Sequence, residues 1–382
     1  MQNLRRNPLR MGLTAVAFAL PMAIFVAAIS FVVTLGEVAA HFQRQLRLGV
    51  HHRTTLTNPL PEGVRRKIEE LDPERSRLTA VCGMRWFGGR VPDTQNTITS
   101  LGADVDTFPT VYSDVEMTPE EIEAWNRERQ GCVVGGNPAT LYGWEVGDRL
   151  VLESTVPPYL KLEFRVLKVL DNKERANFFY FRRDYLVESS KDAGLNDPRC
   201  NVFWIKCKSQ AALRSLQQEI DALFANSPDE TRSEDENAFV ANFLQAAGDI
   251  PGLMRAMAVV VVFVIALVAG NTMMMSFRER TPELAVFKAI GFQSGRVFLI
   301  VLAESVMLAM FGALIGIVPA ATVLYLFPPR GLAVGPISGL EVSWIAVGGS
   351  FVISLLVGIV SGLWPAYQAM RLQTTRALRR TG

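Results

Sequence analysis

Charged residues are scarce in this sequence, and their scarcity is uneven. Asp, Glu, Lys and Arg make up 20% of the 382 residues, whereas apolar residues make up 49%. The apolar excess lies at the two ends of the chain, while residues 37–255 have the composition of a soluble domain. This distribution excludes an ordinary soluble protein. It predicts a membrane protein that carries one large polar domain.

Motifs for catalysis and nucleotide binding are absent. No GxSxG or HExxH motif occurs, and no SxxK has a plausible partner set. No GxxxxGK[ST] motif occurs either, so these residues contain no phosphate-binding P-loop. The polar segment holds 27 Lys and Arg against 33 Asp and Glu, and this acidic balance argues against nucleic acid. We expect no catalytic, cofactor-binding or metal residues, and no enzyme activity of the chain itself.

Histidine and cysteine are also few. No CxxC pair exists, which disfavours a metal site. We interpret His51 and His52 as a solvated pair beside the membrane, with His41 nearby. All four cysteines lie in the polar segment, at positions 82, 132, 200 and 207. Because an exported domain meets an oxidising compartment, one or two disulfides are possible, and four buried thiols are an equally good interpretation.

Four long apolar stretches predict four transmembrane helices. They cover residues 11–36, 256–277, 297–327 and 342–367, and only Glu304 interrupts them. About 20 residues of helix cross the hydrocarbon core, where the backbone must bond internally. The first stretch is longer than the ~7–15 apolar residues of a signal peptide, so we expect a retained helix.

Positive charge predicts the orientation of these helices. Residues 1–10, 278–296 and 368–382 together hold eleven Lys and Arg, whereas the loop 328–341 holds only Arg330. We therefore expect both termini in the cytoplasm and residues 37–255 outside it.

The polar segment has the pattern of a mixed α/β domain. We expect helices at residues 61–71 and 209–224, and strands at residues 132–134, 149–153, 162–170 and 201–208. Residues 227–237 are polar and acidic, which is typical of a linker or an exposed loop. A helical pattern then leads into the second span. Gly248 and Pro251 interrupt it, so we expect a bent stalk.

The segment between the second and third spans predicts a short cytoplasmic helix. Thr281, Pro282 and Glu283 form a typical helix start, and Gly291 a typical end. Its apolar face combines Leu284, Phe287 and Ile290, with Val286 alongside. That face could bind a partner, pack on the spans of this chain, or lie in the lipid interface.

The spans themselves contain two further signals. Gly312 and Gly316 are four residues apart in the third span, as are Gly358 and Gly362 in the fourth. Such spacing lets helices approach closely, either within one subunit or between two. Glu304 is an ionisable group about 12 Å along a helix from Arg296. It predicts a polar partner on a neighbouring helix or a functional role.

Several of these residues form a family resemblance. The pattern Glu279-Arg280-x-x-Glu283-Leu-Ala-x-x-Lys288-Ala-x-Gly291, together with Glu304 and the later Trp364-Pro365, resembles the FtsX-like permease signature. The order of one span, a large domain and three spans resembles MacB-type permeases, as do residues 135–152. The compact size is similar to the DevC-like branch. Phe292 departs from the pattern, which usually has a small residue there.

The resemblance implies a transport subunit of an ABC-type export or mechanotransmission complex. In such systems a permease homodimer in the bacterial inner membrane is served by a separate ATPase, which supplies the ATP site. A periplasmic membrane-fusion protein and membrane lipid are further expected partners. The implied ATPase contacts are Arg280, Glu283, Leu284, Phe287, Lys288 and Gly291. An alternative is an FtsX-like scaffold that regulates an extracytoplasmic enzyme.

Overall fold

The computed structural model describes residues 8–157, 159–246, 249–326 and 342–372. These residues form two compact units. The membrane unit comprises the described residues up to 35 and from 249 onward, and the α/β unit comprises those from 36 to 246. The expected cytoplasmic tail beyond residue 372 and the loop 327–341 lie outside the described residues.

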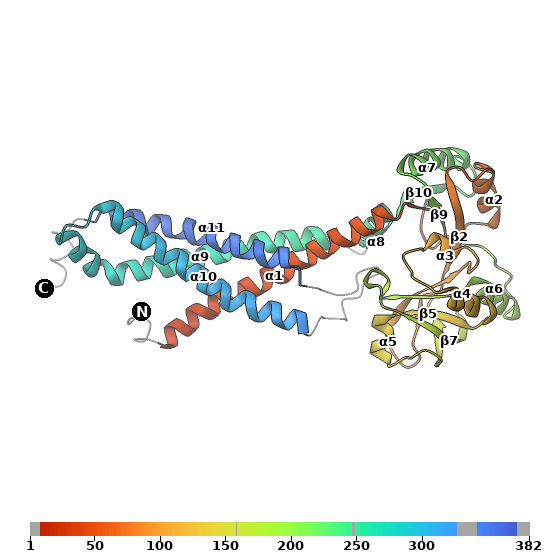
Figure 1. Ribbon diagram of the computed structural model, residues 1–382, viewed down its shortest axis with the longest axis horizontal. Coiled ribbons are helices and arrows are strands. Elements are labelled where there is room, and N and C mark those ends of the chain that lie inside the picture. The colour runs from red at the N-terminus through yellow and green to blue at the C-terminus, as the bar shows by residue number, and fades with distance from the viewer. Residues whose placement is uncertain (1–7, 158, 247–248, 327–341, 373–382) are drawn as a thin grey trace. The chain divides into compact units, whose positions relative to one another are not determined.

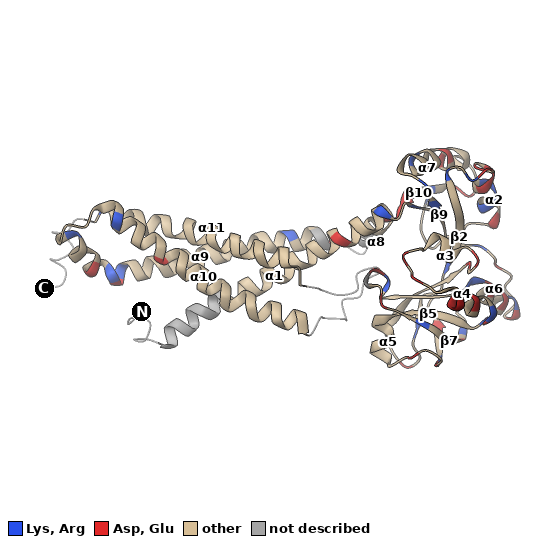
Figure 2. Ribbon diagram, viewed as in Figure 1, with Lys and Arg blue, Asp and Glu red and all other residues tan. Residues whose placement is uncertain are grey.

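Four helices in the described residues are long and apolar enough to cross a membrane, as the sequence predicts. They are α1 (Pro8–Arg44), α9 (Ile250–Ala289), α10 (Ser294–Leu326) and α11 (Trp344–Met370). Figure 1 shows α9, α10 and α11 running side by side. In Figure 2 these helices carry few charges except near the α9–α10 connection and at the start of α9.

The α/β unit follows α1 and precedes α9. Its strands are β1 (Arg47–His52), β2 (Leu78–Trp86), β3 (Gly89–Arg90), β4 (Thr97–Ala103), β5 (Gly131–Gly135), β6 (Arg149–Ser154), β7 (Lys161–Leu170), β8 (Phe178–Arg182), β9 (Val202–Cys207) and β10 (Thr231–Asp235). Its helices are α2 (Glu62–Glu70), α3 (Phe108–Val111), α4 (Pro119–Arg127), α5 (Gly136–Tyr142), the short turn η2 (Lys173–Arg175), α6 (Arg183–Asp192), α7 (Gln210–Phe224) and α8 (Glu236–Ala246).

The ten strands form one sheet with an open part and a closed part. The order is β10-β1-β9-β2-β4-β3-β6-β7-β5-β8, and β8 also pairs with β4 in parallel. The strands β4, β3, β6, β7, β5 and β8 therefore close into a ring, while β10, β1, β9 and β2 continue as an open sheet. Phe87, Phe164 and Phe181 are buried in the core cluster of the ring.

Helices cover the open sheet and complete its core. Val64 and Ile68 of α2 pack with Leu216 and Ile220 of α7 against β1, β2 and β9. Trp125 of α4 belongs to a second cluster that also contains residues of α3 and β8. Periodicity predicted α2 and α7 because each helix places one apolar stripe on the sheet. The four predicted strands are confirmed as β5, β6, β7 and β9.

The prediction of a linker at residues 227–237 is wrong. Residues 231–235 form β10, an edge strand antiparallel to β1, and Thr231, Ser233 and Glu234 are buried. The alternation of a strand is hidden because the inward-facing side chains are polar. The interpretation of His51 as a solvated residue beside the membrane is also wrong. His51 lies in β1, is buried at 7% exposure and packs edge-on against Phe239.

The structure contains no disulfide among the described cysteines. All four are free and buried. Cys132 lies in the core of the ring, Cys82 in the cluster around α3, and Cys200 and Cys207 in the cluster under α7. Burial raises the pKa of Cys82 and of Cys207 to about 12. All four thiols are therefore part of the core, and the Cys200 sulfur also accepts a hydrogen bond from Arg183 at 3.0 Å.

Candidate functional site in the membrane unit

The predicted cytoplasmic helix is not a separate helix. Residues 281–289 continue α9 without a break, and Pro282 lies inside it. Thr281 is therefore not an N-cap, and its hydroxyl instead donates to the carbonyl of Phe277 at 2.9 Å. Proline removes only one backbone donor, and the helix tolerates that loss here. Gly291 ends the turn as predicted, with a φ of 100° that a residue with a Cβ rarely adopts.

The apolar residues at this end of α9 divide into a buried and an exposed set. Leu284 is buried in a cluster with Met273, Val297 and Val301, so it is not available as a contact for another protein. The exposed set, which we call the apolar tip, consists of Val286, Phe287, Ile290 and Phe292. The rings of Phe287 and Phe292 lie 5.4 Å apart, and Ile290 is 70% exposed.

Charged side chains fix the apolar tip to the other helices. The guanidinium of Arg280 pairs with Glu304 on α10, which gives Glu304 a polar partner, and also lies 3.3 Å from Glu283. The Lys288 ammonium donates to the backbone carbonyls of Met370 and Leu372, at 2.6 and 3.1 Å. Arg280 and Lys288 therefore connect the end of α9 to α10 and to the end of α11.

Three of the four candidate glycines are sites of close helix packing within this subunit. A Cβ added at Gly316 would lie 2.5 Å from the carbonyl oxygen of Ala19 on α1. Added at Gly358 or Gly362 of α11, it would lie 2.9 Å from Ala309 Cβ or 2.6 Å from Ser305 Cβ on α10. Gly312 is buried on α10. The Ser305 hydroxyl also donates to the Gly358 carbonyl at 2.8 Å, which reinforces the α10–α11 contact.

A buried charge cluster that the sequence did not predict lies in the α/β unit. Arg47 is the first residue of β1, opposite Lys206 of β9, and its guanidinium donates to Glu236 of α8 at 2.5 Å and to Asp114 at 3.0 Å. Arg175 lies 2.6 Å from Glu236 and 3.3 Å from Asp114. The side chains of these four residues are at most 4% exposed. No motif marks the cluster, since its members are far apart in sequence.

The cluster is electrically balanced, with two cations and two anions. Burial raises the pKa of Asp114, but Arg175 and Arg47 outweigh this effect and hold the pKa well below its usual value. Asp114 therefore contributes stability at pH values above the unfolded pKa of about 3.9 and loses it as the pH falls through the lower folded pKa. The guanidinium groups of Arg47 and Arg175 also lie 4.5 and 4.8 Å from the ring centre of Tyr112.

Comparisons with known proteins find sequence similarity mainly in the membrane unit. Residues 255–374 match the FtsX-like permease C-terminal family. The macrolide export ATP-binding/permease protein MacB of Sodalis glossinidius is 36% identical over 126 residues, which are 33% of this chain and 19% of MacB. The uncharacterized ABC transporter permease MJ1507 of Methanocaldococcus jannaschii is 26% identical over 285 residues, 70% of this chain and 67% of that protein.

A solved structure resembles part of this chain only distantly. The extracellular domain of the noncanonic ABC-type transporter YknZ from Gram-positive bacteria aligns at 12% identity and a TM-score of 0.33, over 49% of this chain and 99% of that domain. That likeness is too weak to bear on function, whereas the sequence match covers α9, α10 and α11. Residues 255–374 are therefore similar to the C-terminal domain of FtsX-like permeases, and the relatives that share this region are named as permeases of ABC transporters.

Proposed function

We propose that this chain is the permease subunit of an ABC-type complex in the bacterial inner membrane, and that it works as a homodimer with a separate ATPase. ATP binding and hydrolysis by that subunit would move α9 and, through it, the α/β unit. The apolar tip carries the proposal, because four apolar side chains remain exposed where a basic segment joins α9 to α10. The absence of a P-loop in these residues is compatible with an ATP site on another chain.

The contacts of the apolar tip indicate which helices would move when the ATPase displaces it. A continuous helix of 40 residues runs from the tip to the start of α9, so a displacement of the tip would be passed along that helix. Arg280 and Lys288 tie the same end to α10 and α11. We infer that Phe287 and Ile290 bind the ATPase, while Arg280, Glu283 and Lys288 hold the tip in place and Gly291 shapes its turn.

Phe287 is the expected anchor of that interface. Phe287→Ala should weaken ATPase binding about 30-fold, because truncating an aromatic anchor typically costs about 2 kcal/mol or more. Ile290→Ala should weaken it by a similar or smaller factor. The measurement is the dissociation constant between the purified chain and the ATPase that co-purifies with it in mild detergent.

Phe263→Ala is the matched control for this experiment. Phe263 is also on α9 and 63% exposed, but it lies within the apolar span, so its truncation should leave ATPase binding unchanged. Wild-type ATPase binding by both Phe287→Ala and Ile290→Ala would contradict the assignment of the apolar tip as the coupling element.

A second prediction tests the proposed orientation. In intact cells, Asn58→Cys should react with a membrane-impermeant maleimide and Gln293→Cys should not, because the Lys and Arg bias puts residues 278–296 inside. Both positions are exposed, and the four native thiols are buried, so the wild-type chain should give little background. Mass spectrometry of the labelled chain measures the result. Labelling of Gln293→Cys but not of Asn58→Cys would show that the chain has the opposite orientation.

A further inference from the structure

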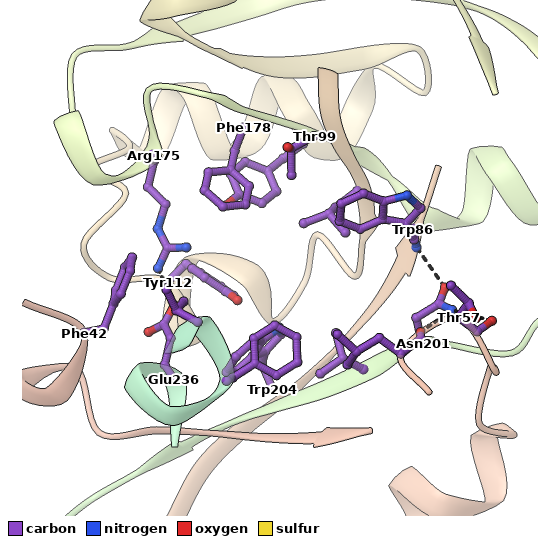
Figure 3. Close-up of a pocket in the computed structure, with 16 residues that line it drawn as sticks. Phe42, Thr57, Trp86, Thr99, Tyr112, Arg175, Phe178, Asn201, Trp204 and Glu236 are labelled. Atoms are coloured by element: carbon purple, nitrogen blue, oxygen red, sulfur yellow. Dashed lines mark hydrogen bonds and ion pairs between the residues drawn. The ribbon is translucent and has the colours of Figure 1, made fainter. Parts of the chain in front are cut away.

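A cavity of about 290 Å³ lies within the α/β unit, and the coupling proposal does not use it. Its wall is mainly apolar and rich in aromatic rings, with Trp86, Tyr112, Phe178 and Trp204 around it (Figure 3). The volume is close to the lower end of the ~300–1,000 Å³ found for small-molecule sites, which also tend to be lined by apolar and aromatic side chains. The cavity is therefore large enough for a ligand of one or two rings.

The wall of the cavity offers no net charge to a ligand. Among its lining residues, only Arg175 and Glu236 are charged, and they pair with each other at 2.6 Å. The balanced cluster with Arg47 and Asp114 satisfies both of them further. An ionic ligand would lose its hydration here without gaining a free counter-charge. The cavity therefore favours a neutral ligand.

One polar group on the wall lacks a partner. Tyr180 lines the cavity and is only 1% exposed. Its hydroxyl is buried and has no hydrogen-bond partner among the described residues. Buried polar groups are nearly always hydrogen-bonded, and Tyr180 is a residue of the cavity wall, so a small rotation of its ring toward a ligand would give the hydroxyl the partner that it lacks. Burial raises the pKa of Tyr180 to about 12, so the phenol stays protonated and is able to donate.

Residues near the first and the last segment of the α/β unit both line the cavity. Phe42 near the end of α1 and Phe239 of α8 both line it. A ligand in the cavity would therefore contact the two segments through which the chain enters and leaves the unit.

We propose that the α/β unit binds a neutral, largely aromatic small molecule in this cavity, with a carbonyl or ether oxygen of the ligand accepting a hydrogen bond from Tyr180. The site is independent of the ATPase and of the apolar tip, so it stands whether or not the coupling proposal holds.

Benzophenone is a suitable probe because it is neutral, has two rings and carries one carbonyl acceptor. On irradiation its carbonyl abstracts hydrogen from a nearby C–H group, and the two resulting carbon radicals combine into a C–C bond. We expect saturable labelling of peptides that line the cavity, measured by mass spectrometry on the full chain in detergent. Tyr180→Phe should raise the half-saturating concentration about tenfold, since it removes one hydrogen bond and little else.

A pair of threonines on β4 gives a matched control. Thr99 lines the cavity, whereas Thr97 is exposed on the same strand and does not line it. Thr99→Phe should fill the cavity and abolish its labelling, and Thr97→Phe should leave labelling unchanged, with both variants checked for a wild-type unfolding midpoint in urea. If Thr99→Phe does not fold, Val240→Phe on α8 is a second variant that would fill the cavity. Labelling confined to α9–α11, unsaturable labelling of the cavity, or wild-type labelling of Tyr180→Phe would overturn the proposal.

Discussion

Glu236→Ala should destabilise the α/β unit by about 3–5 kcal/mol, because it removes the partner of two buried cations. Glu236 pairs with Arg47 at 2.5 Å and with Arg175 at 2.6 Å, and the two guanidinium groups are almost inaccessible to solvent. After the substitution Asp114 alone would face both positive charges. Urea unfolding of the full chain in detergent, followed by tryptophan fluorescence, measures the loss as a lower midpoint.

Glu230→Ala is the control for this prediction. Glu230 also pairs with an arginine, Arg53 at 3.1 Å, but the two side chains are 33% and 65% exposed. Exposed pairs contribute about 1 kcal/mol or less, so Glu230→Ala should leave the midpoint almost unchanged. Equal midpoints for Glu236→Ala and Glu230→Ala would show that the cluster does not hold the fold.

Gly362→Leu should disrupt the pairing of α10 and α11. Even the Cβ of the new side chain would lie 2.6 Å from Ser305 Cβ, and both atoms are attached directly to helix backbones. Neither helix is able to accommodate the group without moving, so we expect a loss of about 3 kcal/mol, at the upper end of typical overpacking. The measurement is the thermal midpoint of the detergent-solubilised chain, with size-exclusion chromatography to report aggregation.

Gly348→Leu makes the same change on the same helix. A Cβ at Gly348 would meet nothing within 4 Å, so this variant should keep the wild-type midpoint. If Gly362→Leu were as stable as Gly348→Leu, the small residues of α11 would not be required for packing against α10.

The regular elements of this chain were predictable where one face is apolar and the other polar. Exposed and buried residues alternate along residues 161–166 of β7, and α7 carries Leu213, Leu216 and Ile220 at helical spacing. The pair β1 and β10 was not predictable. Their buried positions include Arg47, His51, Thr231 and Ser233, whose polarity reflects the charge cluster and the edge of the sheet.

The site in the membrane unit was only partly predictable. Gly291 was recognised because a positive φ favours glycine, and Glu304 because an ionisable group in a span needs a partner. The interruption expected at Thr281 did not occur, since local capping preferences are weaker than the packing that holds a long helix together. Whether Leu284 or Phe287 faces outward depends on α10 and α11, and no local pattern contains that information.

The pairing of β1 with β10 determines how the α/β unit responds to force. The chain enters β1 three residues after α1 ends and leaves β10 directly into α8, and Leu48 lies opposite Asp235. Both connections therefore emerge at the same end of two adjacent antiparallel strands. Drawn together along the strand axis, they place no load between the strands. If the two connections were pulled apart, the hydrogen bonds between β1 and β10 would break one at a time, starting at this end. The Arg47–Glu236 ion pair holds the two strands together at that end. The β1–β10 pair would therefore stay closed when its two connections are displaced together and would open when they are pulled apart.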